Sequence, residues 1–144
     1  MAVRIRRMET SDLPAVAAIE RAITKSRRTS TLQAYVRRQL GAGEGVCLVA
    51  AVGETVAGFL VGDVRPWEFG EDREVAWVKV VGVDPRHQGS GLGHLLGERF
   101  LAEVRRRGIR RVKTLVEWDA GDLVAYFQSL GFDRGGAIVL ERSV

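Results

Sequence analysis

The stretch Val81-Gly82-Val83-Asp84-Pro85-Arg86-His87-Gln88-Gly89-Ser90-Gly91-Leu92-Gly93-His94 decides how the rest of this chain is interpreted. An apolar strand leads into a glycine-rich turn, and the turn leads directly into an amphipathic helix. Glycines let a ligand approach the main chain closely, and a helix start carries unpaired N–H groups and partial positive charge. The segment therefore predicts a binding site for a phosphate or pyrophosphate.

The spacing of the glycines separates this segment from other phosphate-binding loops. A Walker-type loop is excluded because no lysine follows the glycines. The dinucleotide fingerprint Gly-x-Gly-x-x-Gly fails in both frames, because its third glycine would have to stand at His94 or at Leu96. The pattern that remains is Gln88-x-x-Gly91-x-Gly93, preceded by Val-x-Val-x-Pro.

This pattern resembles motif A of the GCN5-related N-acetyltransferases, Gln/Arg-x-x-Gly-x-Gly/Ala, which holds the pyrophosphate of acetyl-coenzyme A. A second segment, residues 125–132, resembles the end of motif B of that family, Leu-Tyr-x-x-x-Gly-Phe. The resemblance covers the C-terminal half well, whereas the N-terminal half matches in element order only. It implies that acetyl-coenzyme A is the cosubstrate and that the main chain of Val81 and Val83 meets its pantetheine arm. The residues implied to contact the pyrophosphate are Gln88, Gly89, Ser90, Gly91, Leu92, Gly93 and His94.

Composition predicts one ordinary globular domain over residues 1–144. The sequence has no apolar run of membrane-spanning length and no signal-peptide pattern, so we expect a cytoplasmic protein that does not contact membranes. A single cysteine, Cys47, excludes an internal disulfide, and its apolar neighbours predict a buried structural thiol. With only two histidines as well, we expect no metal site.

Periodicity and turn signals predict the element order β-α-α-β-β-β-α-β-α-β. This is an α/β fold in which helices flank one mixed sheet. The acetyltransferase family has this order, and its fourth and fifth strands splay apart to admit the pantetheine arm. The expected elements are strand 3–7, a helix after caps at 10–12, helix 31–40, strands 46–52, 56–63 and 74–83, helix 91–107, strand 112–117, helix 122–130, capped by Asp122, and strand 136–142.

Acetyl transfer to an amine requires a deprotonated amine, a hydrogen-bond donor at the carbonyl oxygen and a proton for the departing thiolate. The resemblance implies that the acetyl group passes directly from thioester to amine in a ternary complex. Main-chain N–H groups near Val81 or Val83 are the candidate donors. Two carboxylates, Glu117 and Glu74, are the candidate bases.

The general acid is where the chain departs from the family pattern. The family tyrosine stands four residues before the glycine of the Gly-Phe pair, and this chain has Phe127 there. Tyr126, one residue earlier and about 100° around a helix, is the candidate acid. The alternative is a packing tyrosine, with no tyrosine acid in this protein.

The predicted activity is therefore N-acetylation of a primary amine on a small molecule, peptide or protein. The loop 67–72 is a candidate mouth for the amine, and the family makes a homodimer one expectation. A first rival, kept open by Phe127, is a non-catalytic acetyl-coenzyme A-binding sensor. A second is a nucleic-acid-binding module, because residues 1–40 hold nine basic against three acidic residues. No interleaved aromatic residues support base stacking there.

Overall fold

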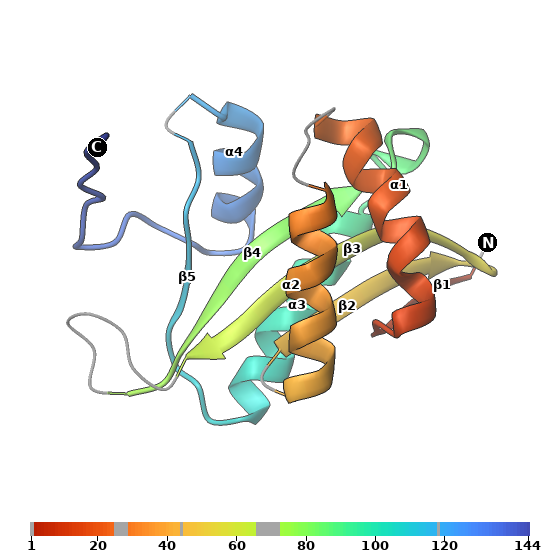
Figure 1. Cartoon of the computed structure of the whole chain (residues 1–144), viewed down its shortest axis with the longest axis horizontal. Coiled ribbons are helices and arrows are strands. Elements are labelled where there is room, and N and C mark those ends of the chain that lie inside the picture. Colours follow the sequence, from red (N-terminus) through yellow and green to blue (C-terminus); the bar gives the residue numbers. More distant parts are fainter. Residues whose placement is uncertain (1, 25–28, 44, 66–72, 118) are drawn as a thin grey trace.

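The computed structural model describes residues 2–24, 29–43, 45–65, 73–117 and 119–144, and one five-stranded sheet runs through its middle (Figure 1). Strand order in the sheet follows chain order. Strands one to four pair antiparallel with one another in turn, and the fifth pairs parallel with the fourth. The strands are β1 (Val3–Arg7), β2 (Gly45–Val52), β3 (Thr55–Arg65), β4 (Val75–Val83) and β5 (Val112–Thr114).

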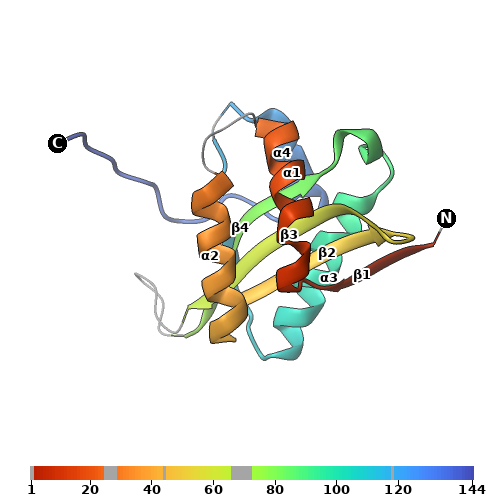
Figure 2. The same cartoon turned by 45° about the vertical axis from the view of Figure 1, so that its right-hand side comes forward.

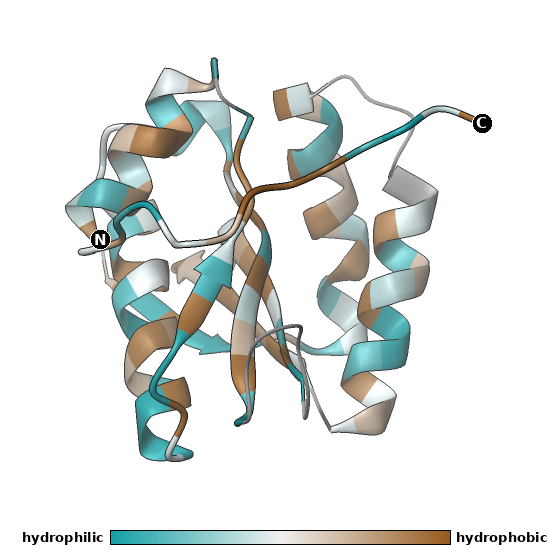
Figure 3. Cartoon of the chain, turned by 90° about the vertical axis from the view of Figure 1, so that its left-hand side faces the viewer, coloured by the Kyte–Doolittle hydropathy of each residue, from teal (hydrophilic) through white to brown (hydrophobic). Residues whose placement is uncertain are grey.

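Two helices cover each face of the sheet, and much of their apolar surface faces the strands (Figure 3). One layer holds α1 (Leu13–Thr24) and α2 (Thr29–Ala42), and the other holds α3 (Leu92–Arg106) and α4 (Gly121–Ser129). Two short 3-10 turns, η1 (Thr10–Asp12) and η2 (Pro85–His87), precede α1 and α3. The predicted α/β fold with a mixed sheet flanked by helices is confirmed.

The central strands, β2 to β4, are largely apolar on both faces because each face is covered by helices. In β3 the side chains of Phe59 and Val61 belong to the core under α1 and α2, whereas Leu60 belongs to the core under α3 and α4. All three are fully buried. This alternation explains the near-continuous apolar runs that the sequence shows in the central strands.

Helix α3 lies very close to the sheet where β3 has a glycine. A Cβ atom at Gly62 would lie 2.7 Å from the Trp77 carbonyl oxygen and would overlap the ring of Phe100. Phe100 is fully buried in α3. The absent side chain therefore lets the Phe100 ring pack directly against the backbone of the sheet.

Most predicted elements are present, with shifted ends. The two-residue turn Gly53-Glu54 between β2 and β3 is confirmed, with Gly53 at φ 61°. The strand predicted over 112–117 ends at Thr114. The cap predicted at Asp122 is wrong, because α4 begins at Gly121 and Asp122 lies in its first turn. The predicted amine loop 67–72 and the basic run 25–28 lie outside the described residues.

The predicted last strand, 136–142, is wrong for this structure. Residues 133–144 form no strand, and all of them are exposed. A strand needs a neighbour to accept and donate its main-chain hydrogen bonds. None of the described strands pairs with this segment, although its sequence has the apolar character of a strand.

Replacing Gly62 with Ala should destabilise the fold. The added methyl group would clash with the Trp77 carbonyl oxygen on one side and with the buried Phe100 ring on the other, and neither has room to shift. We expect the free energy of unfolding to fall by about 1–3 kcal/mol. Gly41→Ala in α2 is the matched control, since nothing lies within 4 Å of a Cβ there. Urea denaturation followed by circular dichroism measures both; equal stability of the two variants would contradict the close approach of α3.

Candidate functional site

One aspartate folds the turn that leaves β4. The Asp84 N–H donates to the Ala57 carbonyl at 2.8 Å, which fixes the end of β4 against β3. The Asp84 carboxylate accepts hydrogen bonds from the Arg86 guanidinium at 2.9 Å and from the Arg86 main-chain N–H at 3.0 Å. These bonds lower the pKa of Asp84 to about 2. The charged carboxylate therefore holds η2 in place ahead of the glycines.

The two glycines after η2 adopt left-handed backbone conformations. Gly89 has φ 83° and Gly91 has φ 85°, and nothing lies within 4 Å of a Cβ placed on either. Gly91 is the N-cap of α3, and no side chain caps the helix start. The first N–H groups of α3 are thus left for an outside acceptor, which is the arrangement that binds phosphate.

The other predicted pyrophosphate contacts lie around this turn. Gln88 and Ser90 are exposed, and the Ser90 hydroxyl donates to the His87 carbonyl within the turn. His94 is also exposed, on the first turn of α3. Leu92 is different, because its side chain is only 2% exposed and lies in the core. Only the main chain of Leu92 can therefore meet a ligand.

A one-residue bulge in β4 changes which way the strand faces. Val61 of β3 pairs with Val80, but the next residue, Gly62, pairs with Val78, so Lys79 is the extra residue. Val78 belongs to the core under α3 and α4, whereas Val80 packs against the core under α1 and α2. In a regular strand these two side chains would share one face.

The bulge also changes which residues of β4 point their main-chain N–H and C=O groups toward β3 and which point them toward β5. Before it, Ala76 N–H donates to Arg111 O at 3.1 Å, on the β5 side. After it, the bond from Asp84 N–H shows that even-numbered residues face β3. The main-chain groups of Val81 and Val83 therefore face away from β3, toward the edge that β5 leaves open. Gln88 Nε2 donates to Val83 O on that side, at 3.3 Å.

Strands β4 and β5 pair over only three residues and then separate. The last pair is Val78 with Thr114, and the Thr114 hydroxyl donates to Val78 O at 3.0 Å. Beyond it β4 continues to Val83 with no paired strand on this side among the described residues. The structure thus has the splayed strands that the resemblance implied, and the open edge leads to the glycine turn.

The two candidate bases lie at different ends of β4. Continued past its last pair, Val78 with Thr114, the parallel register would set Glu117 level with Val81, although residues 115–117 form no strand. Glu74 precedes the first residue of β4, about 20 Å along the strand from Val81. Both are exposed. Chain register therefore favours Glu117 over Glu74 as the carboxylate nearer the open edge of β4.

The Tyr126 hydroxyl is bonded to the start of α3. It donates to the Gly93 carbonyl at 2.6 Å, and burial raises the pKa of the phenol to about 12. A Cβ at Gly97 would lie 2.8 Å from the Tyr126 hydroxyl oxygen and would overlap Leu130. Helix α4 therefore packs on α3 through two glycines one turn apart. Sequence reasoning missed this contact, although the Gly-x-x-x-Gly spacing was its signal.

The residue at the family's tyrosine position, Phe127, is part of the core. It is 6% exposed, and its ring meets those of Tyr126 and Phe132 edge to face, with centroids 5.0 and 5.1 Å apart. A phenylalanine has no proton to give, and its burial keeps it away from any ligand.

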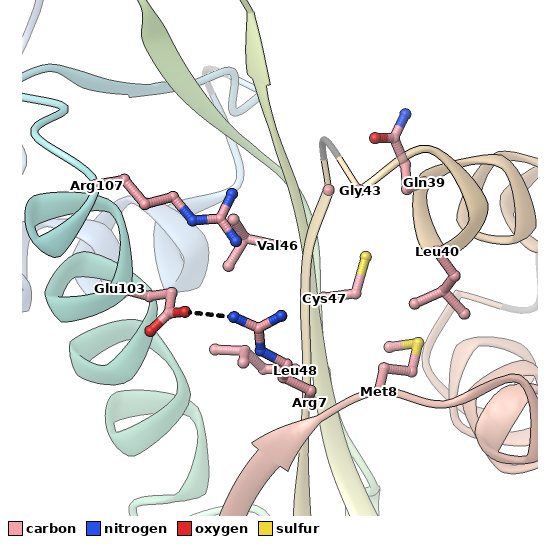
Figure 4. A pocket seen from close by; sticks show the side chains of 11 residues that line it. Arg7, Met8, Gln39, Leu40, Gly43, Val46, Cys47, Leu48, Glu103 and Arg107 are labelled. Atoms are coloured by element: carbon pink, nitrogen blue, oxygen red, sulfur yellow. Dashed lines mark hydrogen bonds and ion pairs between the residues drawn. The ribbon is translucent and has the colours of Figure 1, made fainter.

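A pocket of about 190 Å³ lies at the other end of the molecule, where β1 ends and β2 begins (Figure 4). The ion pair Arg7–Glu103, at 2.9 Å, spans part of it. Cys47 lies in its wall, and burial raises the pKa of the thiol to about 11. The thiol is therefore protonated at neutral pH, and none of the predicted site residues lines this pocket.

Neither a metal-binding cluster nor a membrane-spanning helix is found in the part of the chain that the structure describes. No group of three or more His, Cys, Asp or Glu side chains there could hold a metal ion. None of the helices in the same part has the length and apolar character needed to span a membrane.

Solved structures of known fold resemble the whole chain. The aminoglycoside N-acetyltransferase AAC(6')-Iy in complex with CoA superposes with a TM-score of 0.85 at 17% identity, covering 99% of this chain and 95% of that one. The aminoglycoside 6'-N-acetyltransferase AAC(6')-Ih from Acinetobacter baumannii gives 0.83 at 16% identity, covering 99% of both chains. At this identity the likeness concerns the fold.

Sequence relatives are more similar over a shorter stretch. A mycothiol acetyltransferase from Thermobispora bispora is 38% identical over 88 residues, which is 61% of this chain and 30% of the relative. Another, from Saccharomonospora viridis, is 44% identical over 69 residues, or 48% of this chain and 22% of the relative. The chain thus spans less than a third of these relatives.

The model of one protein family matches residues 11–132, which include both helical layers and the glycine turn. With that match over most of its length, the chain belongs to the acetyltransferase (GNAT) family.

Proposed function

We propose that this protein transfers an acetyl group directly from acetyl-coenzyme A to a primary amine, with both substrates bound together. The observation that carries the proposal is the continuity of two features, the open β4 edge with Val81 and Val83 facing outward and the uncapped glycine turn that follows it. Together they offer main-chain groups to an extended amide chain and then N–H groups to a pyrophosphate. Coenzyme A has these two parts in that order.

The residues fit this ligand on physical grounds. A Cβ at Gly89 or Gly91 would project into open space, so the turn leaves room for phosphate oxygens against the main chain. Gln88 can donate to a phosphate or keep its bond to Val83. Bound acetyl-coenzyme A supplies an acetyl group activated as a thioester.

Because the acetyl group is already activated, the chain itself has to supply only hydrogen-bonding and proton-transfer groups. The N–H of Val81 or Val83 offers a hydrogen bond to the carbonyl oxygen, where negative charge grows during transfer. Glu117, which the continued register sets level with Val81, is the carboxylate best placed to take a proton from the amine, directly or through water. Neither step requires a covalent enzyme intermediate, which agrees with the buried, protonated state of the Cys47 thiol.

Tyr126 has two possible roles, acid or positioning residue, and its hydrogen bond favours the second. The only hydroxyl proton is already donated to Gly93 O. To protonate a thiolate, the phenol would first have to give up that bond. As a positioning residue it would hold the first turn of α3, and with it the N–H groups that meet the pyrophosphate.

The amine is proposed at the level of its class. The relatives named as mycothiol acetyltransferases favour a small molecule related to mycothiol. The position of Glu117 is equally compatible with a peptide or protein amine. Release of free thiol from acetyl-coenzyme A across a panel of small amines, amino sugars and peptides distinguishes these substrates.

A second candidate is a non-catalytic protein that binds acetyl-coenzyme A. It is favoured by the buried Phe127 at the acid position and by the engaged Tyr126 hydroxyl. It predicts binding of acetyl-coenzyme A by calorimetry without thiol release for any amine.

Gly91→Val should weaken acetyl-coenzyme A binding by about 100-fold or more, because a β-branched side chain both opposes φ 85° and fills the phosphate socket. Gly108→Val is the matched control. Gly108 has φ 83° in equally open space, but it follows the far end of α3. Calorimetric titration should show near-normal affinity for the control and a loss for Gly91→Val. Equal affinities would remove the socket from the proposal.

Tyr126→Phe should raise the KM for acetyl-coenzyme A several-fold and leave kcat within a few-fold, because it removes the bond that holds Gly93 while keeping the ring. Steady-state kinetics of thiol release separate the two constants. A fall in kcat of about 100-fold at unchanged KM would instead assign the acid role to Tyr126.

Glu117→Gln should lower kcat/KM by about 10²-fold or more at neutral pH, because the amide cannot accept the proton of the amine. Glu74→Gln, at the distant end of β4, is the control and should keep normal rates. If the deficit of Glu117→Gln shrinks at high pH, where the amine is already neutral, the base role is supported. Normal activity at pH 7 would exclude it.

A further inference from the structure

The pocket at the far end of the molecule exists because β1 is shorter than β2, the strand with which it pairs. The last pair, Arg7 with Leu48, leaves the first residues of β2 without a neighbour on this side among the described strands. One further bond, from Met8 N–H to Cys47 O at 2.9 Å, joins the chain to β2 before it turns away into η1. Figure 2 shows the last turns of α2 and α3 on either side of this end of the sheet, with η2 at the other end. The pocket is therefore a gap in the edge of the sheet.

The unpaired edge of β2 offers main-chain groups to the pocket. Because Cys47 O accepts the bond from Met8, the odd-numbered residues of β2 direct their main-chain groups toward the β1 side. Gly45 lies two residues earlier and directs its N–H the same way, past the last residue that pairs with β1. Gly45 and Cys47 both line the pocket. N–H groups at the edge of a sheet can contribute to a concave site for an anion.

One side of the pocket is positively charged. The guanidinium groups of Arg7 and Arg107 lie there, on the α3 side of β2 (Figure 4). Arg7 donates to Glu103 Oε1 at 2.9 Å, and Arg106 donates to the same oxygen at 2.6 Å, so the charge of Glu103 is already matched. The Arg107 guanidinium has no hydrogen-bond or ion-pair partner among the described residues. The pocket thus holds a positive charge that no described carboxylate neutralises.

The other side of the pocket is apolar. Met8, Leu40 and Cys47 lie across β2 from the arginines (Figure 4). Met8 and Cys47 are both buried in the core under α1 and α2, and the Cys47 thiol carries no charge at neutral pH. The pocket therefore passes around the open edge of β2, from a cationic side to a hydrophobic one. A ligand that fits both sides has an anionic group and a hydrocarbon group.

The size and the position of the pocket limit the ligand further. Its volume of about 190 Å³ equals that of about six water molecules. Sites for drug-sized ligands are larger, at roughly 300–1,000 Å³. A nucleotide or a coenzyme is therefore too large for it. The pocket is also separate from the glycine turn, because the 15 residues of α3 place its two ends about 22 Å apart.

We propose that this pocket binds a small aliphatic carboxylate. The carboxylate group lies between the guanidinium groups of Arg7 and Arg107 and accepts the N–H of Gly45. The hydrocarbon part passes around the edge of β2 and covers Met8 and Leu40. A charge-assisted bond to a guanidinium is stronger than a neutral hydrogen bond, and the buried carbon atoms add affinity that an inorganic anion lacks.

Titration with isovalerate, a small branched carboxylate, tests the site in the whole protein. Amide NMR spectra at low ionic strength should show shifts centred on Gly43, Gly45 and Cys47, with a Kd on the order of 1 mM. Isovaleramide has the same shape without the charge and should bind these residues about 10-fold or more weakly, as should inorganic phosphate. Shifts confined to the glycine turn at 89–93, or equal affinity for the amide or for phosphate, would overturn the proposal.

A pair of arginine variants separates this pocket from the general charge of the α3 end. Arg107→Gln should raise the Kd for isovalerate about 10-fold or more, because it removes the guanidinium that has no described partner. Arg105→Gln is the matched control and should leave the Kd within about two-fold. It removes the same charge from the same end of α3, but Arg105 does not line the pocket.

Equal effects of the two substitutions would show that the anion responds to overall charge alone, and the site would be wrong. The amide spectrum of each variant reports directly whether the fold is intact. Neither the titration nor the variants involve acetyl-coenzyme A, so the result is independent of the proposed function.

Discussion

The candidate site depends on one extra residue in β4. Lys79 has no partner in β3. From that point on, the side chains of β4 exchange faces, and its main-chain N–H and C=O groups exchange the edges toward which they point. Without the bulge, the groups of Val81 and Val83 would be used up in pairing with β3. With it, they face the side where β5 has ended, and the strand is free to bind a ligand as if it were another strand.

The glycines of the motif have two different roles. Gly89 and Gly91 have left-handed backbones beside open space, which suits contact with a ligand. Gly93 instead meets the ring and hydroxyl of Tyr126, and Gly97 lets α4 approach one turn further along. The motif therefore joins a ligand-facing turn to a tightly packed helix pair, and the packing helps to fix where the turn lies.

Sequence reasoning located the turn, the open-edge residues and the order of most elements, because glycine positions and apolar periods are local signals. It could not locate the bulge at Lys79, because valines stand on both sides of it and the apolar pattern of the strand is the same with or without an extra residue. Nor could it separate Glu117 from Glu74, because their distances from Val81 depend on the parallel pairing of β5. The last strand was predicted from residues that do favour a strand, but none of the described strands pairs with that segment.

Strand order equal to chain order has a consequence for how the protein reaches its folded state. Strands β2 to β4 form a meander in which each pairing closes a short stretch of chain, whereas β1 pairs with β2 across α1 and α2, and β5 pairs with β4 only after the chain has crossed over through α3. Contacts between residues near in sequence form sooner than distant ones. We expect the β2–β4 meander to assemble first and the crossover through α3 to dock onto it afterwards, so the groove between β4 and β5 forms later than the strand edge that lines it.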